Sequence, residues 1–339
     1  MRVLVTGANG FIGRRVVTAL LDRGYEVRAL VRQDPREARK LWADLVDVVQ
    51  SDLSAGTSTL EPLFEGVGCL VHLASALRGT ATEQHASTVD GTRRLLEAMS
   101  RTATRRIVLA SSFAVYDWSA IGRVMDERSP LLDGSRAAAR GPYAAAKVEQ
   151  EQLTRRMSAE QGWDLTILRP GFVWGPGAEH PACLGLDLGP AFLVVGPLSR
   201  PSLSYVDNCA DLFATVVADP RAVGQTFNVV DRQEVSTWRH ARNHFGLSGH
   251  RRVCVPLPLF LGSSGARLAH SVLGPLVPRL PSVLAPGAFD ARFRPVQADT
   301  RAAREALGWT PPWEYGEALR RTFGASDGRA AGKDQAGRR

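Results

Sequence analysis

The sequence predicts an α/β protein with a doubly wound parallel sheet and a smaller C-terminal lobe. Short apolar runs alternate with helix-compatible segments through the first half of the chain, which is typical of strands joined by helical crossovers. A glycine-rich turn joins the first apolar run to the first helical segment. After Pro170 this alternation gives way to sequence rich in glycine and proline, as expected of a lobe built from insertions.

The individual elements follow from these runs. The first strand is expected at residues 2–6, and the helix after it should end near Gly24. Five further runs have the length and apolar content of buried strands. They are Glu26–Val31, Val46–Gln50, Cys69–Leu73, Arg106–Ala110 and Leu165–Leu168.

Composition places the chain among ordinary globular proteins. Of its 339 residues, 44% are hydrophobic and 22% are charged. The formal charge of +8 favours anionic ligands or surfaces, but the basic residues are scattered along the chain, so we do not expect a nucleic-acid partner. The four cysteines lie far apart without metal-ligand spacing, which indicates reduced thiols and no metal site.

The ends of the sequence and its most apolar stretch bear on location. An apolar strand begins within two residues of Met1 and leaves no room for a signal peptide, so a cytoplasmic protein is expected. The stretch from Val255 to Val277 is interrupted by prolines, a glycine and Arg267, which excludes a membrane span there. Peripheral contact with a membrane stays open.

The glycine-rich turn is the first chemical motif. It reads Thr6-Gly7-Ala8-Asn9-Gly10-Phe11-Ile12-Gly13 and lies between the expected first strand and first helix. Glycines allow a pyrophosphate to approach the backbone closely, and a helix N-terminus offers unpaired N–H groups. We therefore expect dinucleotide binding by Gly7, Asn9, Gly10, Phe11, Ile12 and Gly13. The alternative is a tight turn that binds nothing.

The end of the second strand indicates which dinucleotide is bound. An acidic residue there would bond the ribose 2′-hydroxyl of NAD, but this chain has Val31 at that place and Arg32 after it. A guanidinium can clamp a 2′-phosphate through charge-assisted hydrogen bonds. NADP(H) is thus the expected cofactor and NAD(H) the alternative, while a solvated arginine that binds neither is also compatible with the sequence.

Tyr143 and Lys147 are the expected catalytic pair. They are four residues apart in an Ala- and Glu-rich run, so they project from the same face of a helix. A nearby ammonium lowers the pKa of a tyrosine and makes it a better proton donor and acceptor at neutral pH. Lys147 is expected to supply that charge and to hold the nicotinamide ribose.

A hydroxyl at the end of the fifth strand completes the expected catalytic set. Ser111 and Ser112 both follow that strand, and either could hydrogen-bond a substrate oxygen on which charge develops. Ser112 is the first candidate and Ser111 the reserve. His72, in an expected buried strand, is interpreted as a core histidine rather than as an acid or base.

These motifs resemble the extended short-chain dehydrogenase/reductase superfamily, over about Met1 to Phe323. The superfamily includes NAD-dependent epimerase/dehydratases and 3β-hydroxysteroid dehydrogenase-like enzymes, and the segment with Arg32 is similar to dihydroflavonol reductase-like enzymes that use NADP. The Rossmann-type fold and homodimer formation are implied by this resemblance. It also implies that the cofactor is contacted by Asp52, Leu53, Leu73, Ala74, Ser75, Pro170 and Val173.

The resemblance also suggests how the chain is divided. Residues 1–170 would bind NADP and carry the catalytic helix, and residues 171–324 would mainly bind substrate, with some segments returning to the Rossmann core. Residues 325–339 would form a flexible tail. The motif at Tyr205-Val206-Asp207-Asn208 is similar to a late motif of the superfamily, and Leu307-Gly308-Trp309 to its C-terminal one.

Two departures from the superfamily pattern bear on function. Thr88 stands where asparagine is frequent, which puts a proton-relay role for that position in doubt. Phe172 stands where many nucleotide-sugar enzymes have asparagine, so we expect a pocket walled largely by apolar side chains, with residues 256–284 as a lid.

Three functions are compatible with these observations. The first is reversible oxidation of a secondary alcohol to a carbonyl on a bulky, largely apolar small molecule of sterol, lipid or polyketide type. The second is a nucleotide-sugar epimerase, dehydratase or reductase, which two or more arginines converging beside Phe172 would favour. The third is a non-catalytic NADP-binding scaffold, against which the set of Ser112, Tyr143 and Lys147 argues.

Overall fold

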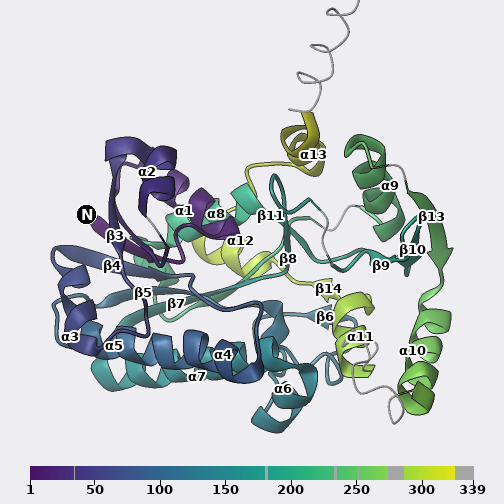
Figure 1. The fold of residues 1–339 in the computed structure, drawn as a ribbon, viewed down its shortest axis with the longest axis horizontal. Coiled ribbons are helices and arrows are strands. Elements are labelled where there is room, and N and C mark those ends of the chain that lie inside the picture. Colours follow the sequence, from purple (N-terminus) through teal and green to yellow (C-terminus); the bar gives the residue numbers. More distant parts are fainter. Residues whose placement is uncertain (34, 180–181, 233–234, 251, 274–285, 325–339) are drawn as a thin grey trace, which may run out of the picture.

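A seven-stranded parallel sheet forms the centre of the computed structural model (Figure 1). The structure describes residues 1–33, 35–179, 182–232, 235–250, 252–273 and 286–324. The strand order is β12-β7-β5-β4-β1-β2-β3, and every neighbouring pair is parallel. The strands are β1 (Arg2–Thr6), β2 (Glu26–Val31), β3 (Val46–Gln50), β4 (Val67–His72), β5 (Arg106–Ala110), β7 (Asp164–Pro170) and β12 (Thr226–Val229). The doubly wound sheet predicted from the sequence is confirmed.

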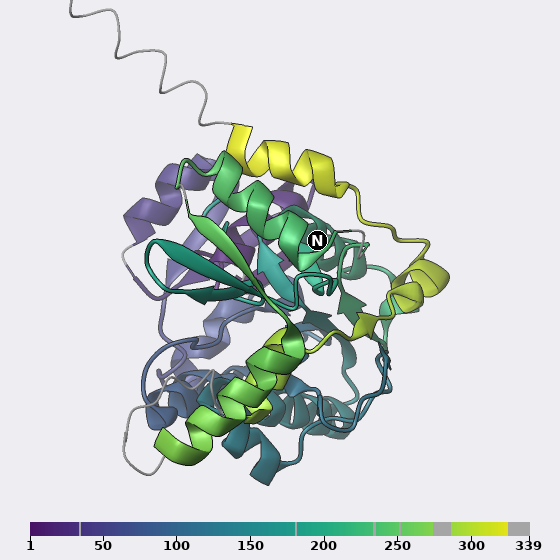
Figure 2. The same ribbon diagram turned by 90° about the vertical axis from the view of Figure 1, so that its right-hand side faces the viewer.

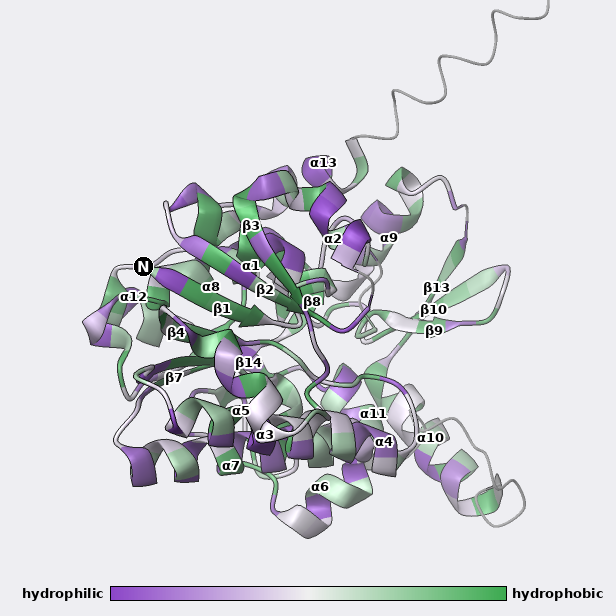
Figure 3. Ribbon diagram, turned by 60° about the vertical axis from the view of Figure 1, so that its left-hand side comes forward, coloured by the Kyte–Doolittle hydropathy of each residue, from purple (hydrophilic) through white to green (hydrophobic). Residues whose placement is uncertain are grey.

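Helices cover both faces of this sheet. One face packs against α1 (Phe11–Asp22), α2 (Pro35–Trp42), α8 (Val206–Val216) and α12 (Arg301–Leu307). The other face is covered by α3 (Thr57–Leu60), α5 (Gly91–Ser100) and α7 (Pro142–Gln161). Figure 3 shows the apolar strands between helices whose outer turns are hydrophilic, which is why the strands read as continuous apolar runs.

Helix α7 has clear sequence signals at both ends. Pro142 occupies its first position, where a proline costs no hydrogen bond, and Gly162 ends it in a left-handed conformation with φ 65°. Upstream, α4 (Ala81–His85) continues through a π-helical turn, Ala86–Asp90, into α5. α6 (Gly134–Arg140) precedes α7 directly.

A smaller lobe lies beside the main sheet (Figures 1 and 2). It contains the three-stranded sheet β13-β10-β9 and the parallel pair β8 and β11. A further pair joins β14 to β6. The bounds are β6 (Val124–Met125), β8 (Phe172–Trp174), β9 (Gly185–Asp187), β10 (Ala191–Val195), β11 (Leu203–Tyr205), β13 (Val253–Leu257), β14 (Gln297–Ala298), α9 (Thr237–Leu247), α10 (Leu259–Leu273), α11 (Pro286–Phe293) and α13 (Tyr315–Phe323).

The C-terminal half of the chain also contributes to the main sheet. Strand β12 pairs with β7, and helices α8 and α12 pack on the same face as α1. The expected tail over 325–339 and part of the expected lid over 256–284 lie outside the described residues. Among the residues that the structure describes, no helix has the length and apolarity needed to cross a bilayer.

The order of the central strands determines where a site can form. Strands β1, β4, β5 and β7 are consecutive neighbours and all run in the same direction. The loops that follow them therefore meet at one edge of the sheet, which is where open α/β sheets bind their ligands.

Candidate active site

The turn after β1 is built for close backbone approach. Gly7 has φ +68°, and a Cβ atom there would lie 2.9 Å from the backbone nitrogen of Ala74. A Cβ atom on Gly13 would lie 2.1 Å from the carbonyl oxygen of Gly7. No side chain fits at either position without a shift of the backbone, so both glycines are required by the fold of the turn.

The start of helix α1 is open to an anion. Its N-cap is Gly10, whose backbone N–H donates to the carbonyl of Gly7 at 2.9 Å and which has no side chain to cap the helix. The N–H groups of the first turn and the positive end of the helix dipole thus face the loop. Together with the glycine cradle, this geometry fits the pyrophosphate of a dinucleotide.

The remaining residues of the turn support it from both sides. The side-chain oxygen of Asn9 accepts from Arg14 Nε at 3.0 Å. Phe11 and Ile12 are half-buried and pack in the same apolar cluster as Val173, on β8. The turn is therefore held next to the segment that follows β7.

The expected adenosine end also comes together. Val31 is buried at the end of β2, and Arg32 follows it with an exposed side chain. The backbone N–H of Ser54 holds the pKa of Asp52 below its usual range, and Arg32 adds a smaller coulombic contribution. Arg32 and Asp52 are thus neighbours at the carboxyl edge of the sheet, and Leu53 lies beside them, packed against Gly91.

The segment after β4 closes over the turn. The backbone N–H of Leu73 donates to the carbonyl of Thr6 at 3.3 Å, and that of Ala74 to the Thr6 hydroxyl at 3.3 Å. Ser75 continues this segment with intermediate exposure. The structure thus brings the Leu73–Ser75 segment against the glycine turn.

Tyr143 and Ser112 meet above the carboxyl end of β5. Tyr143 lies in the first turn of α7, and its hydroxyl is near that of Ser112, which acts to lower the pKa of the phenol. The Ser112 oxygen also accepts from the backbone N–H of Ala114 at 3.1 Å, which fixes its position before the short 3-10 helix Phe113–Val115. Two hydroxyls are therefore placed side by side in a half-buried setting, where they can share one substrate oxygen.

Lys147 lies one turn further along α7 and is buried. Its Nζ donates to the carbonyl of Ala110 at 2.8 Å and to Gln150 Oε1 at 2.9 Å. Burial lowers the pKa of this lysine to about 7, and the Glu151 carboxylate partly offsets the effect. The ammonium is thus held by two uncharged acceptors and changes its charge near neutral pH.

The pKa of Tyr143 differs from the expectation. Burial raises it, whereas the nearby Ser112 hydroxyl acts in the opposite direction. The expected lowering by the Lys147 ammonium is wrong for this structure, because the hydrogen bonds of Nζ go to Ala110 and Gln150 and desolvation of the phenol dominates.

His72 is a satisfied core residue, as interpreted from its position in a strand. It is 1% exposed, and its two ring nitrogens lie 2.6 Å from Thr6 Oγ1 and 2.8 Å from Thr92 Oγ1. Burial lowers its pKa to about 3, with a further contribution from Lys147, so the ring is neutral at pH 7. Gln150 Nε2 lies 3.2 Å from it and joins it to the lysine.

A buried ion pair fixes α7 against the sheet. Arg169, on β7, donates to both carboxylate oxygens of Glu151, at 2.5 and 3.1 Å. The same carboxylate accepts from the Ser111 hydroxyl at 2.5 Å, and Arg169 donates to the Tyr116 hydroxyl at 3.0 Å. Burial opposes the charge of Glu151, but these donors hold its pKa below the usual range.

This pair also separates the roles of the two serines. The Ser111 hydroxyl is buried and donates to Glu151, whereas Ser112 faces Tyr143. The geometry therefore favours Ser112 over Ser111 as the hydroxyl that meets a substrate. Thr88 accepts from the backbone N–H of Ala76 at 3.0 Å, a structural bond that joins the π-helical segment to the loop after β4.

The segment after β7 passes beside this site. Pro170 is buried at the end of the strand, and Phe172 and Val173 are half-buried on β8. Phe172 lines a hollow together with Trp118, whose indole N–H donates to the Phe113 carbonyl at 3.3 Å. This hydrogen bond joins the wall of the hollow to the loop that carries Ser112.

The lining of this hollow combines apolar side chains with arginines. Arg200, Arg292 and Arg294 line it with Phe172. The Arg292 and Arg294 guanidinium groups donate to the backbone carbonyls of Ala182 and Trp118 respectively. Because these arginines lie around the hollow that Phe172 lines, the condition that favours a nucleotide-sugar substrate is met in part.

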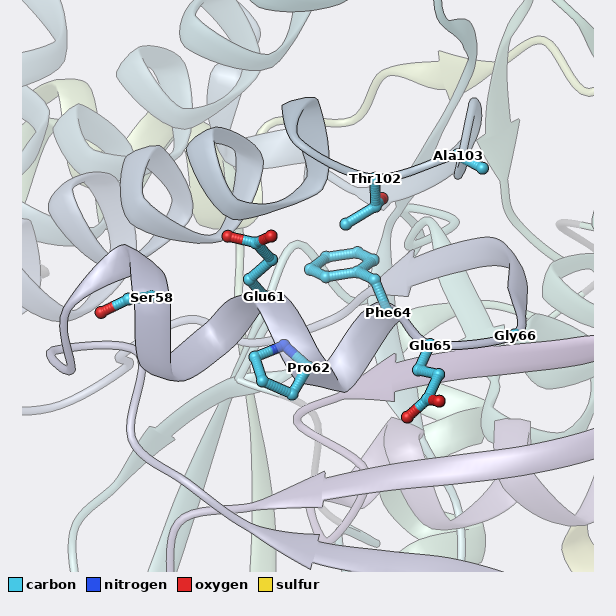
Figure 4. Close-up of a pocket in the computed structure, with 8 residues that line it drawn as sticks. All are labelled: Ser58, Glu61, Pro62, Phe64, Glu65, Gly66, Thr102 and Ala103. Atoms are coloured by element: carbon cyan, nitrogen blue, oxygen red, sulfur yellow. The ribbon is translucent and has the colours of Figure 1, made fainter.

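A second hollow lies at the opposite edge of the sheet (Figure 4). It surrounds the ring of Phe64 between Glu61 and Thr102, on segments that precede β4 and β5. This hollow lies at the amino ends of the strands, whereas the loops of the candidate site lie at their carboxyl ends. It therefore takes no part in the site. Within the described ranges, no group of acidic, histidine or cysteine side chains could hold a metal ion.

Sequence reasoning missed Gln150 and Glu151. Both lie on the buried face of α7, three and four residues after Lys147, so helical spacing from the lysine could have identified them. It also assigned no role to Asn208. The side-chain oxygen of Asn208 accepts from the backbone N–H of Trp313 at 2.8 Å, and its side-chain nitrogen donates to the Trp313 carbonyl at 2.9 Å. Asn208 thus fastens the C-terminal segment to α8.

Comparison with known proteins identifies the family. Residues 3–229 match the model of the NAD dependent epimerase/dehydratase family. A ceramide reductase of Caulobacter vibrioides is 32% identical over 61% of this chain and 58% of its own length. A quinoline-oxide ketoreductase of Stigmatella aurantiaca is 34% identical over 52% of this chain and 51% of its own length. The chain thus spans little more than half of these two relatives.

Longer matches are less similar. A 3 beta-hydroxysteroid dehydrogenase/Delta 5-->4-isomerase of Mycobacterium tuberculosis is 27% identical over 94% of this chain and 88% of its own length. Among solved structures, a short-chain dehydrogenase/reductase superfamily protein from Agrobacterium tumefaciens with bound NAD has a TM-score of 0.73 at 20% identity, covering 98% of each chain. A likeness at this identity shows the shared fold.

The buried ion pair leads to a prediction about stability. Glu151→Gln keeps the shape of the side chain but leaves the Arg169 charge buried without its counter-ion, which should cost about 3–5 kcal/mol of unfolding free energy. Urea denaturation measures this loss. The control is Glu317→Gln, which breaks an exposed pair with Arg320 and should cost far less. Equal losses in the two variants would contradict the prediction.

Proposed function

Because this chain belongs to the NAD dependent epimerase/dehydratase family, we propose that it is an NADP(H)-dependent oxidoreductase that interconverts a secondary alcohol and a carbonyl. The observation that carries the proposal is the placement of the Tyr143 and Ser112 hydroxyls near each other, with Lys147 one helical turn away on α7. Residues 1–170 would hold the cofactor, and residues 171–324 would mainly shape the substrate pocket.

Each residue of the set has a distinct role in the proposed reaction. Tyr143 donates a proton to the substrate oxygen during reduction and accepts it during oxidation. Ser112 donates a hydrogen bond to the same oxygen and stabilises the negative charge that develops there. Lys147 contributes a donor toward the cofactor ribose, and Gln150 keeps its ammonium oriented. The nicotinamide cofactor, when bound, supplies or accepts the hydride.

The proposed cofactor site follows the loops at the carboxyl edge of the sheet. Gly7, Gly10 and Gly13 would leave room for the pyrophosphate at the start of α1. Arg32 would bind the 2′-phosphate, and Asp52 the adenine amine. The exposed guanidinium of Arg32 and the apolar Val31 support NADP(H) over NAD(H).

Two observations restrict the substrate. Two of the relatives are a ceramide reductase and a ketoreductase, which supports a bulky apolar ketone or alcohol. The arginines beside Phe172 support an anionic group, as in a nucleotide sugar, and a UDP-glucose 4-epimerase of Vibrio cholerae is 24% identical over 94% of each chain. We infer that the substrate combines an apolar body with an anionic group. A nucleotide sugar is the second candidate.

The first functional prediction concerns proton transfer. Tyr143→Phe removes only the phenolic oxygen, so turnover should fall by about 100-fold or more while NADPH affinity is unchanged. Ketones of steroid, sphingoid and polyketide type and UDP-glucose are the substrates to screen, with NADPH absorbance as the readout and NADPH fluorescence for binding. Tyr25→Phe, outside the site, is the control. Turnover that survives Tyr143→Phe would refute the mechanism.

The second prediction concerns cofactor choice. The intact chain should bind NADPH more tightly than NADH, and Arg32→Ala should weaken NADPH binding about tenfold or more while leaving NADH binding unchanged. Isothermal titration calorimetry with both nucleotides measures this. Arg105→Ala, just before β5 and thus at the amino edge of the sheet, gives the same change in net charge as a control. Equal affinities of the intact chain for NADPH and NADH would overturn the assignment.

The third prediction concerns the substrate. Arg200→Ala combined with Arg292→Ala should weaken binding of UDP-glucose, used as an anionic probe, about tenfold or more, and should leave a neutral 3-ketosteroid nearly unaffected. Calorimetry in the presence of saturating NADP measures both ligands. An intact chain that binds the neutral steroid and shows no affinity for any anionic probe would restore the purely apolar substrate.

A further inference from the structure

Helix α10 presents its large apolar residues to solvent. Phe260, Leu261, Leu268 and Val272 are between 52% and 68% exposed. Residues 261, 268 and 272 are seven and four positions apart, so they lie on one face of the helix, and Phe260 borders them. We call these four residues the apolar face of α10. Large apolar residues in such a group are unusual on the surface of a monomeric protein.

The inner side of the same helix is made of small residues. Gly262 and Ala266 are buried, and Ala266 packs in a cluster with Phe289 of α11 and Val195 of β10. A Cβ atom on Gly262 would lie 3.1 Å from the ring of Phe289. The helix thus reverses the usual arrangement, in which large apolar residues face the core. Within the part of the chain that the structure describes, the contacts of α10 do not account for the apolar face.

The charged residues of the chain segment that contains α10 have one sign. The sequence contains no aspartate or glutamate from residue 235 to residue 289, whereas arginines and histidines recur there. Arg267 and His270 lie on α10 itself and are exposed. Figure 2 shows α10 and β13 together at the front of the lobe, and Val253 on β13 is 67% exposed. Apolar side chains and positive charge therefore share one end of the molecule.

We propose that α10 lies in the interface of an anionic lipid membrane, with its apolar face among the acyl chains. An apolar face bordered by arginine and free of acidic residues is typical of helices that lie on anionic bilayers. A second copy of the chain is the less suitable occupant. Stable protein interfaces bury about 800 Å² per partner, and four side chains on one helix supply little of that area.

The position of α10 connects the proposed membrane contact with the hollow beside Phe172. Helix α10 packs against α11, and Ala291, Arg292 and Phe293 of α11 line that hollow. A membrane-bound α10 would therefore hold the pocket wall close to the lipid surface, where amphipathic molecules with an anionic group are concentrated. The membrane contact itself does not depend on the proposed reaction.

Vesicle sedimentation of the full chain tests the proposal. The intact chain should bind vesicles of phosphatidylcholine and phosphatidylglycerol at 7:3 at least about tenfold more tightly than vesicles of phosphatidylcholine alone. Leu261→Glu with Leu268→Glu should abolish this binding. The control is Leu41→Glu with Leu45→Glu, which changes two exposed leucines near β3 and alters the net charge equally. The control should still bind, since the chain keeps its apolar face on α10.

Three further measurements separate the outcomes. Thermal unfolding followed by circular dichroism checks that both double variants fold. Size-exclusion chromatography with light scattering reports the oligomeric state, and a dimer that Leu261→Glu with Leu268→Glu converts to monomer would overturn the proposal in favour of a contact between copies. Equal loss of binding in both double variants would also overturn it, because net charge alone would then explain it. NADPH binding in solution should be unchanged in the α10 variant, since the proposed cofactor site lies at the carboxyl edge of the main sheet, so failure of this proposal is distinguishable from failure of the proposed function.

Discussion

The buried pair between Glu151 and Arg169 is the interaction on which the rest of the site depends. It joins α7 to β7, and through Ser111 and Tyr116 it reaches the loop after β5. Taking two charges out of water is costly, and the cost is offset only when every donor and acceptor is paired. The Glu151 carboxylate meets this condition with three donor side chains, from Ser111, Arg155 and Arg169. The phenol of Tyr143, two turns before Glu151, is positioned as a result.

Much of the fold could be predicted from the sequence because its signals are local. The sequence predicts strand β5 at Arg106–Ala110 and it is observed there, since this strand is buried along its whole length and most of it reads as one apolar run. Likewise, Gly7 and Gly13 follow from steric limits within a single turn. Tyr143 and Lys147 follow from helical spacing alone. In each case, residues close in the sequence carry the whole signal.

The parts that could not be predicted depend on contacts between distant segments. Arg200 reaches the hollow beside Phe172 from the loop before β11 and Arg292 from helix α11, so neither reveals its position from its neighbours in the sequence. The pKa of Tyr143 was expected to fall because Lys147 is near, but the ammonium is oriented by Ala110 and Gln150 instead. Desolvation and the direction of a hydrogen bond are properties of the folded chain.

Helix α7 buries polar residues on the side that faces the sheet, among them Lys147, Gln150, Glu151 and Thr154. Each of these side chains has a specific partner, so a single substitution on this face leaves a buried group unpaired. Substitutions at these positions should therefore be accepted during evolution only when both hydrogen-bond partners change together. Positions 151 and 169 should covary among homologues, whereas the outward positions of the same helix are free to diverge independently.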